Sequence, residues 1–278
     1  MSNRIDAIAS VPTALLDRWI GFWASVLELV GALYWLGHDT AGWMWRAFVL
    51  RRVRIGASGI TAQIVRVGVR SISIVMLVSG SIGIILALQT SPTLEQYGQT
   101  DKVANLIGVA VFRELGPLVA AIVMVGFAGA SIAAELGTMV VGEEVEALEA
   151  MGLNPVRYLV VPRLAATVAS LLALAVVSNL TAVFFGMVVG VTALGIPYDL
   201  YVSNTIAQLK MSDFLTGLMK AGVFGLLLGL IACYNGLRVT GGAAGVGRAT
   251  TETVVQTVIF VVLSDLFFST IFYAIGWT

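Results

Sequence analysis

The 278-residue sequence contains one cysteine, Cys233, and one histidine, His38. A single cysteine excludes an internal disulfide and any metal site built from several cysteines. A single histidine likewise excludes a histidine-based metal cluster. We therefore expect no metal site in this chain, and we expect Cys233, which lies in an apolar stretch, to be a buried structural thiol.

Charge is also scarce. Only 12% of the residues are charged, the 16 basic and 16 acidic residues cancel, and 58% of the chain is hydrophobic. A soluble domain carries about 25% charged residues and roughly 45–50% apolar ones. Without a basic excess, no nucleic-acid partner is expected. A soluble fold of this length could not bury so much apolar surface, so the composition predicts an integral membrane protein.

Five apolar segments are long enough to cross a bilayer as helices, which predicts an all-α fold. Ser91-Pro92 should end the first, because proline has no amide to donate. The third is too long to stand upright in a hydrocarbon core of about 30 Å, so it must tilt, bend or protrude. The predicted spans are residues 68–90, 112–133, 164–195, 214–235 and 254–276.

Small residues recur at four-residue spacing in three of these spans, which lets helix backbones approach closely. The sets are Gly126/Ala130/Ala134, Gly186/Gly190 and Gly225/Gly229. They favour a packed bundle or a dimer without indicating a particular function.

The N-terminal region, residues 1–59, has a different pattern. Within residues 13–37 apolar side chains recur at helical spacing, and Asp17 and Glu28 belong to the opposite stripe. Its three tryptophans suit the depth of lipid headgroups. We predict an amphipathic helix lying in the membrane interface; the alternative, a true span, would have to carry three charges through the bilayer.

Lysine and arginine are distributed unequally between the two ends of the predicted spans. Eight arginines precede or enter the first span, and four more flank the loops after spans two and four. The other side has only Lys102, Arg113 and Lys210. The positive-inside rule therefore predicts a cytoplasmic N-terminus and a C-terminus on the outer side.

An acidic segment at about residues 138–152 joins spans two and three. Val141, Val145 and Leu148 recur at the spacing of a short amphipathic helix, and Gly152 is a suitable C-terminal stop. Its glutamates, Glu143, Glu144, Glu146 and Glu149, give it an acidic surface. The residues alone leave open whether this helix binds a partner or is merely solvated.

A glycine-rich segment, Gly241–Arg248, precedes the fifth span. Gly242 and Gly247 have the spacing of a phosphate-binding loop, but Arg248-Ala249 stands where that motif needs lysine and then serine or threonine. No strand is plausible before it. We predict a flexible turn and no ATPase site in this chain.

Four ionisable residues lie in or beside the apolar segments. Arg113 and Glu114 are at the outer end of span two, Lys220 is in span four and Asp265 is in span five. A charge in mid-bilayer costs at least ~2.5–3.5 kcal/mol, so such residues usually find partners in a bundle interior. We expect a Lys220–Asp265 pair, which serves either structure alone or a cavity that contacts a lipid headgroup.

Three stretches resemble a known family: Arg113–Pro117 (RELGP), Gly126–Met139 (GFAGASIAAELGTM) and Glu143–Pro155 (EEVEALEAMGLNP). They closely resemble the MlaE/YrbE family of permease subunits, which belong to ABC transporters that move phospholipid or related lipids with MCE-domain partners. Asn235–Val255 resembles that family's loop before the last span. The resemblance covers residues 60–278, the expected permease domain.

This resemblance implies an MlaE-type fold with one interfacial helix and five spans. It implies a homodimer in the bacterial inner (plasma) membrane, with two cytoplasmic ATPase subunits that hold ATP and Mg and an MCE-type protein on the outer face. It makes the acidic segment a coupling helix seated on the ATPase, with these candidate residues: Glu135, Val141, Glu143, Glu144, Val145, Leu148, Glu149 and Met151.

By the same resemblance, a central lipid cavity at the dimer axis is expected. Its candidate residues are Leu86, Leu94, Tyr97, Arg113, Glu114, Leu115, Leu118, Lys220 and Asp265. No catalytic residue is assigned. The rival interpretations are a scaffold that anchors partner subunits and an intramembrane lipid-modifying enzyme, and the second lacks a catalytic constellation in the spans.

Overall fold

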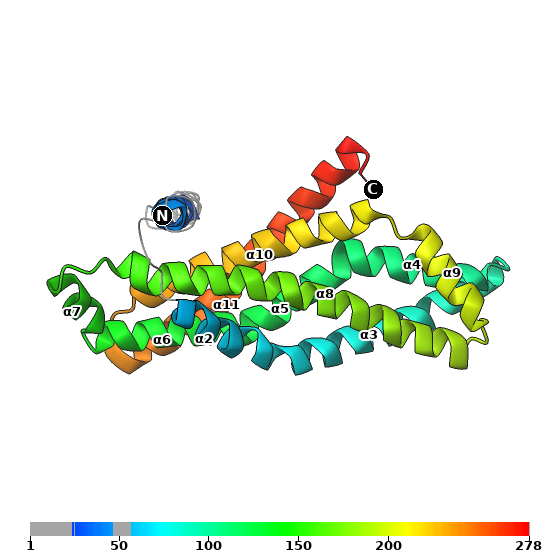
Figure 1. Cartoon of the computed structure of the whole chain (residues 1–278), viewed down its shortest axis with the longest axis horizontal. Coiled ribbons are helices and arrows are strands. Elements are labelled where there is room, and N and C mark those ends of the chain that lie inside the picture. The colour runs from blue at the N-terminus through cyan, green and yellow to red at the C-terminus, as the bar shows by residue number, and fades with distance from the viewer. Residues whose placement is uncertain (1–23, 25, 47–56, 278) are drawn as a thin grey trace, which may run out of the picture.

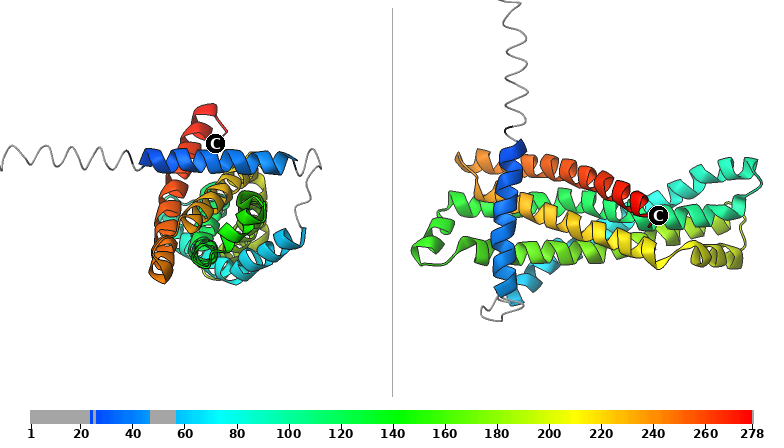
Figure 2. Two further views of the ribbon diagram at one scale, coloured as in Figure 1. Left: turned by 90° about the vertical axis from the view of Figure 1, so that its left-hand side faces the viewer. Right: turned by 90° about the horizontal axis from the view of Figure 1, so that it is seen from above.

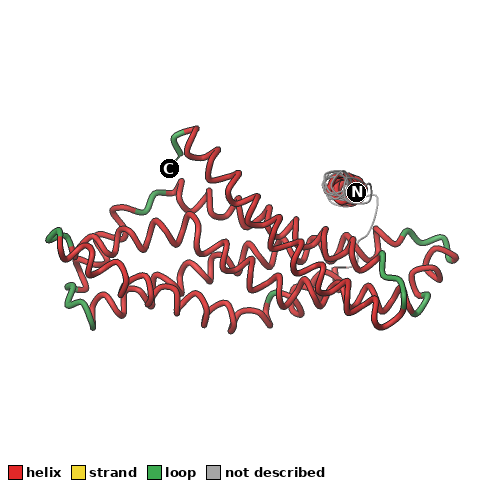
Figure 3. The backbone as a smooth tube through the Cα atoms, turned by 180° about the vertical axis from the view of Figure 1, so that it is seen from behind, coloured by secondary structure: helices red, strands yellow, loops and turns green. Residues whose placement is uncertain are grey.

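The computed structural model describes residues 24, 26–46 and 57–277, and this part of the chain consists of helices joined by turns. Figure 1 shows an elongated bundle, and Figure 3 shows most of the loops gathered at its two ends. Among the described residues, five helices are long and apolar enough to cross a membrane. Each corresponds to one of the five predicted spans, and its ends either agree to within a few residues or extend beyond the prediction. These helices are Gly59–Gln96, Thr100–Val141, Val156–Thr192, Met211–Leu237 and Gly242–Ile275.

The first span combines α2 (Ala57–Val67), a 3₁₀ turn and α3 (Ile72–Gln96). The prediction that Ser91-Pro92 ends it is wrong, because Pro92 lies inside α3. Proline removes only one backbone hydrogen bond, and here it does so just before the last turn. The helix ends instead at Gln96, two residues before Gly98, whose φ of +64° turns the chain so that the Gln99 amide donates to the Leu94 carbonyl at 2.9 Å.

The second span begins earlier than predicted and changes its helical pitch twice. It runs through α4 (Val103–Ala110), a π-helical turn η3 (Val111–Leu115), α5 (Gly116–Met124), a π-helical turn η4 (Val125–Gly129) and α6 (Ala130–Val141). The first π turn precedes Pro117, which has no amide for the carbonyl four residues earlier. A widened turn accommodates that missing bond.

The third span also begins with a π-helical turn before a proline. A π-helical turn, η5 (Val156–Val160), precedes Pro162 in α8 (Val161–Thr192). The 32 residues of α8 form the long predicted helix, which protrudes beyond a core of about 30 Å.

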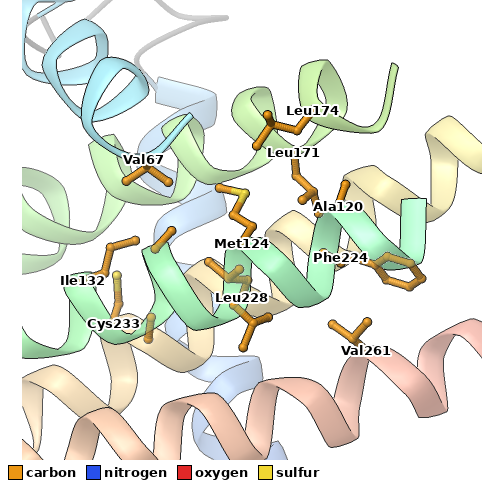
Figure 4. Close-up of a cluster of buried hydrophobic side chains, with 14 of the residues drawn as sticks. Val67, Ala120, Met124, Ile132, Leu171, Leu174, Phe224, Leu228, Cys233 and Val261 are labelled. Atoms are coloured by element: carbon orange, nitrogen blue, oxygen red, sulfur yellow. The ribbon is translucent and has the colours of Figure 1, made fainter. Parts of the chain in front are cut away.

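The bundle core lies where α8 packs against its neighbours α3 and α10 (Met211–Leu237). At the α3–α8 crossing a Cβ on Gly83 would lie 2.0 Å from the Ala182 carbonyl oxygen, so only glycine fits. Cys233 is fully buried, as predicted. The labelled core side chains in Figure 4 are Val67, Ala120, Met124, Ile132, Leu171, Leu174, Phe224, Leu228, Cys233 and Val261.

The predicted small-residue contacts are confirmed in two of the three spans. A Cβ on Gly190 would lie 2.5 Å from the Tyr201 ring, and one on Gly229 would lie 2.5 Å from Thr167 Oγ1. Gly126 differs, because a Cβ there would meet nothing within 4 Å among the described residues. Its surface is exposed in a single copy of the chain.

A short helix that the sequence did not reveal, α9 (Tyr198–Gln208), packs against α4 at one end of the bundle. The Asn204 side-chain amide donates to the Asp101 carbonyl at 3.0 Å, which ties α9 to the start of the second span. Burial raises the pKa of Tyr201 to about 12, so its hydroxyl stays protonated. The sequence of α9 is partly polar and lacks a clear helical pattern, so the helix was not predicted. Its tertiary contacts stabilise it.

The glycine-rich segment is not the flexible turn that we predicted. The turn comprises only a few residues around Gly241, whose φ is +83°, and α11 starts at Gly242 and continues to Ile275. Gly245 lies inside this helix, and the position requires glycine because a Cβ there would come within 1.9 Å of the Thr240 carbonyl oxygen. Close packing, not flexibility, accounts for this glycine.

The N-terminal helix, residues 26–46, runs across the long helices of the bundle, as both views in Figure 2 show, and the right-hand view places it nearer the α7 end. Leu33 is buried and packs with Leu164, Leu230 and Ile231. This orientation is the one expected of a helix that lies in the membrane interface, and that location stays a prediction. The first part of the predicted segment 13–37 falls outside the described residues.

Candidate functional site

Lys220, on α10, is almost completely buried, with a side chain that is 1% exposed. Its Nζ lies 2.5 Å from Glu114 Oε2 and 2.9 Å from Asp265 Oδ1. It also donates to Ser269 Oγ at 2.8 Å. The predicted Lys220–Asp265 pair is therefore confirmed, and three separate helical segments meet at one ammonium group.

Glu114 and Ser269 complete this Lys220 cluster. The Ser269 hydroxyl lies 2.9 Å from Glu114 Oε1 and 2.8 Å from the Asp265 carbonyl oxygen. With both carboxylates ionised, the cluster carries one positive and two negative charges. Glu114 is the more accessible of the two carboxylates, at 39% side-chain exposure against 16% for Asp265. It can therefore present a negative group to a ligand while Lys220 stays enclosed.

The cluster forms because α10 approaches the π turn η3 unusually closely. A Cβ on Gly217 would lie 2.1 Å from the carbonyl oxygen of Phe112, so glycine is required there. Lys220 lies one turn further along α10, beside Glu114 of the same π turn. Neither the close approach nor the widened turn was predicted, although Pro117 is a local signal for the latter.

The neighbouring residue of the π turn, Arg113, makes a second ion pair with α10. Its Nε donates to Asp213 Oδ1 at 2.7 Å. The other oxygen of the fully buried Asp213 accepts the Lys210 amide at 3.0 Å and so caps α10. Asp213 was not predicted as a site residue, because an acidic residue in a first helical turn is a common cap.

Glu135, predicted to contact a partner, lies on α6 and not on the short acidic helix. Its carboxylate pairs with Arg66 at 2.8 Å and with the buried Arg163 at 3.0 Å. It therefore joins the second span to the first and third near the end where α6 meets α7 (Glu144–Ala150).

The predicted amphipathic helix is present as α7 at one end of the bundle (Figure 1). Val145 and Leu148 pack against the core, and the four glutamates are exposed. After α7 the Leu153 amide donates to the Leu148 carbonyl at 3.0 Å, across Gly152 with φ +73°. This confirms Gly152 as the stop. Val141 and Met151 are exposed beside the glutamates, at 46% and 66%.

The apolar candidates for a lipid cavity are not brought together within one chain. Leu86 and Leu94 pack against the cluster formed around α4 and α9, whereas Leu118 packs against the central core. Leu115 borders a small crevice with Ser79 and Ser178, and Tyr97 is 74% exposed at the end of α3.

Comparison with known proteins gives a consistent result. Residues 60–271 match the family model described as Permease MlaE. The chain is 35% identical over 216 residues to a "Probable ABC transporter permease protein" of Rickettsia felis, covering 78% of this chain and 83% of that one. It is 32% identical over 216 residues to one from Synechocystis, covering 78% and 82%. It is 30% identical over 254 residues to one from Pyropia yezoensis, covering 91% and 92%.

Proposed function

The chain belongs to the MlaE family of ABC transporter permeases, and from this we propose that it moves phospholipid or a related lipid between the bacterial inner membrane and an MCE-type periplasmic protein. It is a multi-pass membrane subunit and not an enzyme. We propose that residues 60–278 form the permease domain and residues 1–59 its interfacial region. ATP and Mg would be bound by a separate ATPase.

The observation that carries the lipid proposal is the Lys220 cluster. Charges inside membrane spans are costly and usually mark a pathway or a polar cavity. Glu114 is partly accessible and its partners are held rigidly by three helical segments. Such a group is suited to contact a lipid headgroup that enters between the spans.

We propose that two copies of the chain enclose the transport cavity. The candidate leucines occupy separate clusters in one chain, and Gly126 has an open surface. A second copy would bring further walls to Glu114, Tyr97 and the leucines around the dimer axis. An isologous contact of this kind is the usual way in which two identical subunits form one shared site.

We propose that α7 is the coupling helix for two cytoplasmic ATPase subunits. Its exposed glutamates and Met151 would face the ATPase, while Val145 and Leu148 hold it to the core. One continuous helix, Thr100–Val141, contains η3, α5, η4 and α6 in that order. A pull on α7 would therefore be transmitted along this helix to Glu114.

The orientation follows from the same assignment. With α7 in the cytoplasm, α9 lies on the periplasmic side, the N-terminus is cytoplasmic and the C-terminus periplasmic. The arginine-rich side predicted by the positive-inside rule is then the α7 side. α9 and the exposed Tyr97 would face the MCE-type protein.

A reconstituted lipid-transfer assay tests the proposal. The chain, its ATPase and an MCE-type acceptor are placed in proteoliposomes, and ATP-dependent transfer of labelled phospholipid is measured. Alanine at Arg113, Glu114, Lys220 or Asp265 should reduce transfer while the ATPase still co-purifies. Full transfer by all four variants at normal expression would refute a role of these charges in transport. Assembly without any ATP-dependent lipid transfer by the unaltered chain would favour a scaffold.

A further inference from the structure

A cavity with charged and apolar lining residues lies well away from the Lys220 cluster. It has a volume of about 570 Å³, is partly open, and is bordered by the N-terminal helix, the end of α10 and the start of α11. Arg238 on its wall is 18 residues beyond Lys220 along α10, which is about 27 Å at 1.5 Å per residue. The proposed transport site does not use this cavity.

The cavity has both charged and apolar walls. Arg238 and Arg248 line it together with Glu28 and Glu252. Arg248 has no partner among the described residues, whereas Arg238 pairs loosely with the exposed Glu28 at 3.6 Å and donates a hydrogen bond to Tyr234. A guanidinium group with free donors suits a phosphate oxygen.

The polarity of the cavity changes along α11 in the way that a phospholipid requires. Arg248 and Glu252 come first, and Ile259 and Phe260 follow two to three turns nearer the middle of the span. α11 has 34 residues, or roughly 51 Å, so its first turns project beyond a hydrocarbon core of about 30 Å. The charged wall therefore lies at headgroup depth and the apolar wall at the depth of acyl chains.

The floor of the cavity is rigid. The Asn235 side-chain amide donates to Thr253 Oγ1 at 3.0 Å and to Gln256 Oε1 at 2.9 Å, which locks α10 to α11. The N-terminal helix forms the opposite wall through Val26 and Leu29. A ligand in this cavity would therefore fix the N-terminal helix against a firm surface.

We propose that this cavity binds a membrane phospholipid with a zwitterionic phosphoethanolamine headgroup, which anchors the N-terminal helix to the bundle. Arg238 and Arg248 bind the phosphate, and Glu252 with Glu28 accepts the ammonium group. Ile259 and Phe260 contact an acyl chain. The equal number of guanidinium and carboxylate groups favours this headgroup over a purely anionic one, for which the carboxylates would be repulsive.

Photo-crosslinking of the full chain tests this inference. A benzophenone side chain is placed at position 260, and the protein is put into nanodiscs with equal parts phosphatidylethanolamine and phosphatidylglycerol. We expect mass spectrometry to show mainly phosphatidylethanolamine adducts. Benzophenone at position 267, where Phe267 is 61% exposed on the same helix, is the matched control and should label both lipids equally.

Variants at the charged wall separate a specific site from bulk lipid contact. Each guanidinium group is expected to donate charge-assisted hydrogen bonds to the phosphate, so R238Q/R248Q should lower the adduct yield at position 260 by at least about tenfold. R70Q, at an exposed arginine outside the cavity, should leave it unchanged. E252Q, at an exposed residue, should keep the yield but abolish the headgroup preference. Equal labelling of both lipids that no variant alters would overturn the inference.

Discussion

At the scale of single residues, the Lys220 cluster contains one cation and two carboxylates. Removing the cation should therefore destabilise the protein more than neutralising one carboxylate. Lys220→Met would leave the two carboxylates of Glu114 and Asp265 facing each other without a cation. Breaking a buried ion pair in this way costs roughly 3–5 kcal/mol. Asp265→Asn would leave a balanced Lys220–Glu114 pair, so its cost should be smaller.

Thermal unfolding in detergent measures this difference. We expect a clearly lower midpoint for Lys220→Met than for Asp265→Asn, and partial recovery when Lys220→Met is combined with Asp265→Asn. Equal destabilisation by the two single substitutions would show that the excess negative charge is already neutralised in the native protein.

Gly217 is a second residue whose role can be tested directly. In Gly217→Ala the new Cβ would lie 2.1 Å from the Phe112 carbonyl oxygen, so α10 must move away from the π turn. Overpacking of this kind costs about 1–3 kcal/mol. The movement should also separate Lys220 from Glu114, so lipid transfer should fall.

Gly222→Ala, on the same helix, is the matched control, because its Cβ would meet only a leucine methyl group at 3.7 Å. If both alanine variants keep normal stability and lipid transfer, close approach at Gly217 is not needed for the cluster.

The contacts of the Lys220 cluster were only partly predictable from the sequence. Lys220 and Asp265 could be paired in advance because both are isolated charges in apolar spans. Glu114 was expected in the same region, but its direct contact with Lys220 depends on the π turn and on Gly217. Ser269 gave no signal, since a serine in a span usually bonds to its own helix, as Ser269 also does.

At the scale of helical elements, α7 combines a packed face with an exposed acidic one. Reversing two exposed charges, Glu146→Lys and Glu149→Lys, should leave the bundle intact because neither side chain is buried. If α7 fits a basic groove on the ATPase, like charges would then oppose each other. Co-purification of the ATPase should drop by more than about tenfold.

Glu95→Lys provides the control for this pair, because Glu95 is an exposed glutamate near the C-terminal end of α3. It should leave the ATPase bound. Normal ATPase recovery with the two α7 substitutions would remove α7 from the interface.

Helix positions were predictable, but helix ends were less so. Apolar length located all five spans and hydrophobic spacing located α7. Pro92 and the glycines before α11 were misread because one lost hydrogen bond is tolerated near a helix end and because glycine can serve close packing. α9 depends on contacts with α4, which no local pattern encodes.

At the scale of the whole molecule, one chain shows spans and charge clusters but divides the candidate leucines between two packing clusters. Sequence patterns record which residues are apolar or charged, and they do not record how two copies meet. The cavity that we propose between two copies therefore stays a prediction, and it rests on family resemblance instead of periodicity.

The two ends of the molecule should face opposite sides of the membrane. α7 and α9 are joined by α8, whose 32 residues extend about 48 Å, more than a hydrocarbon core of about 30 Å.

Cys233 is fully buried and is the only cysteine, so a Cys233→Ala variant is a suitable background for labelling introduced thiols. In that background, Tyr198→Cys on α9 should react with a membrane-impermeant maleimide in intact spheroplasts. Glu146→Cys on α7 should react only after the membrane is opened. Both side chains are exposed, so burial would not explain a failure to react. Labelling of both positions from outside would contradict a membrane-crossing α8, and the reverse pattern would place α7 in the periplasm, where no ATPase could reach it.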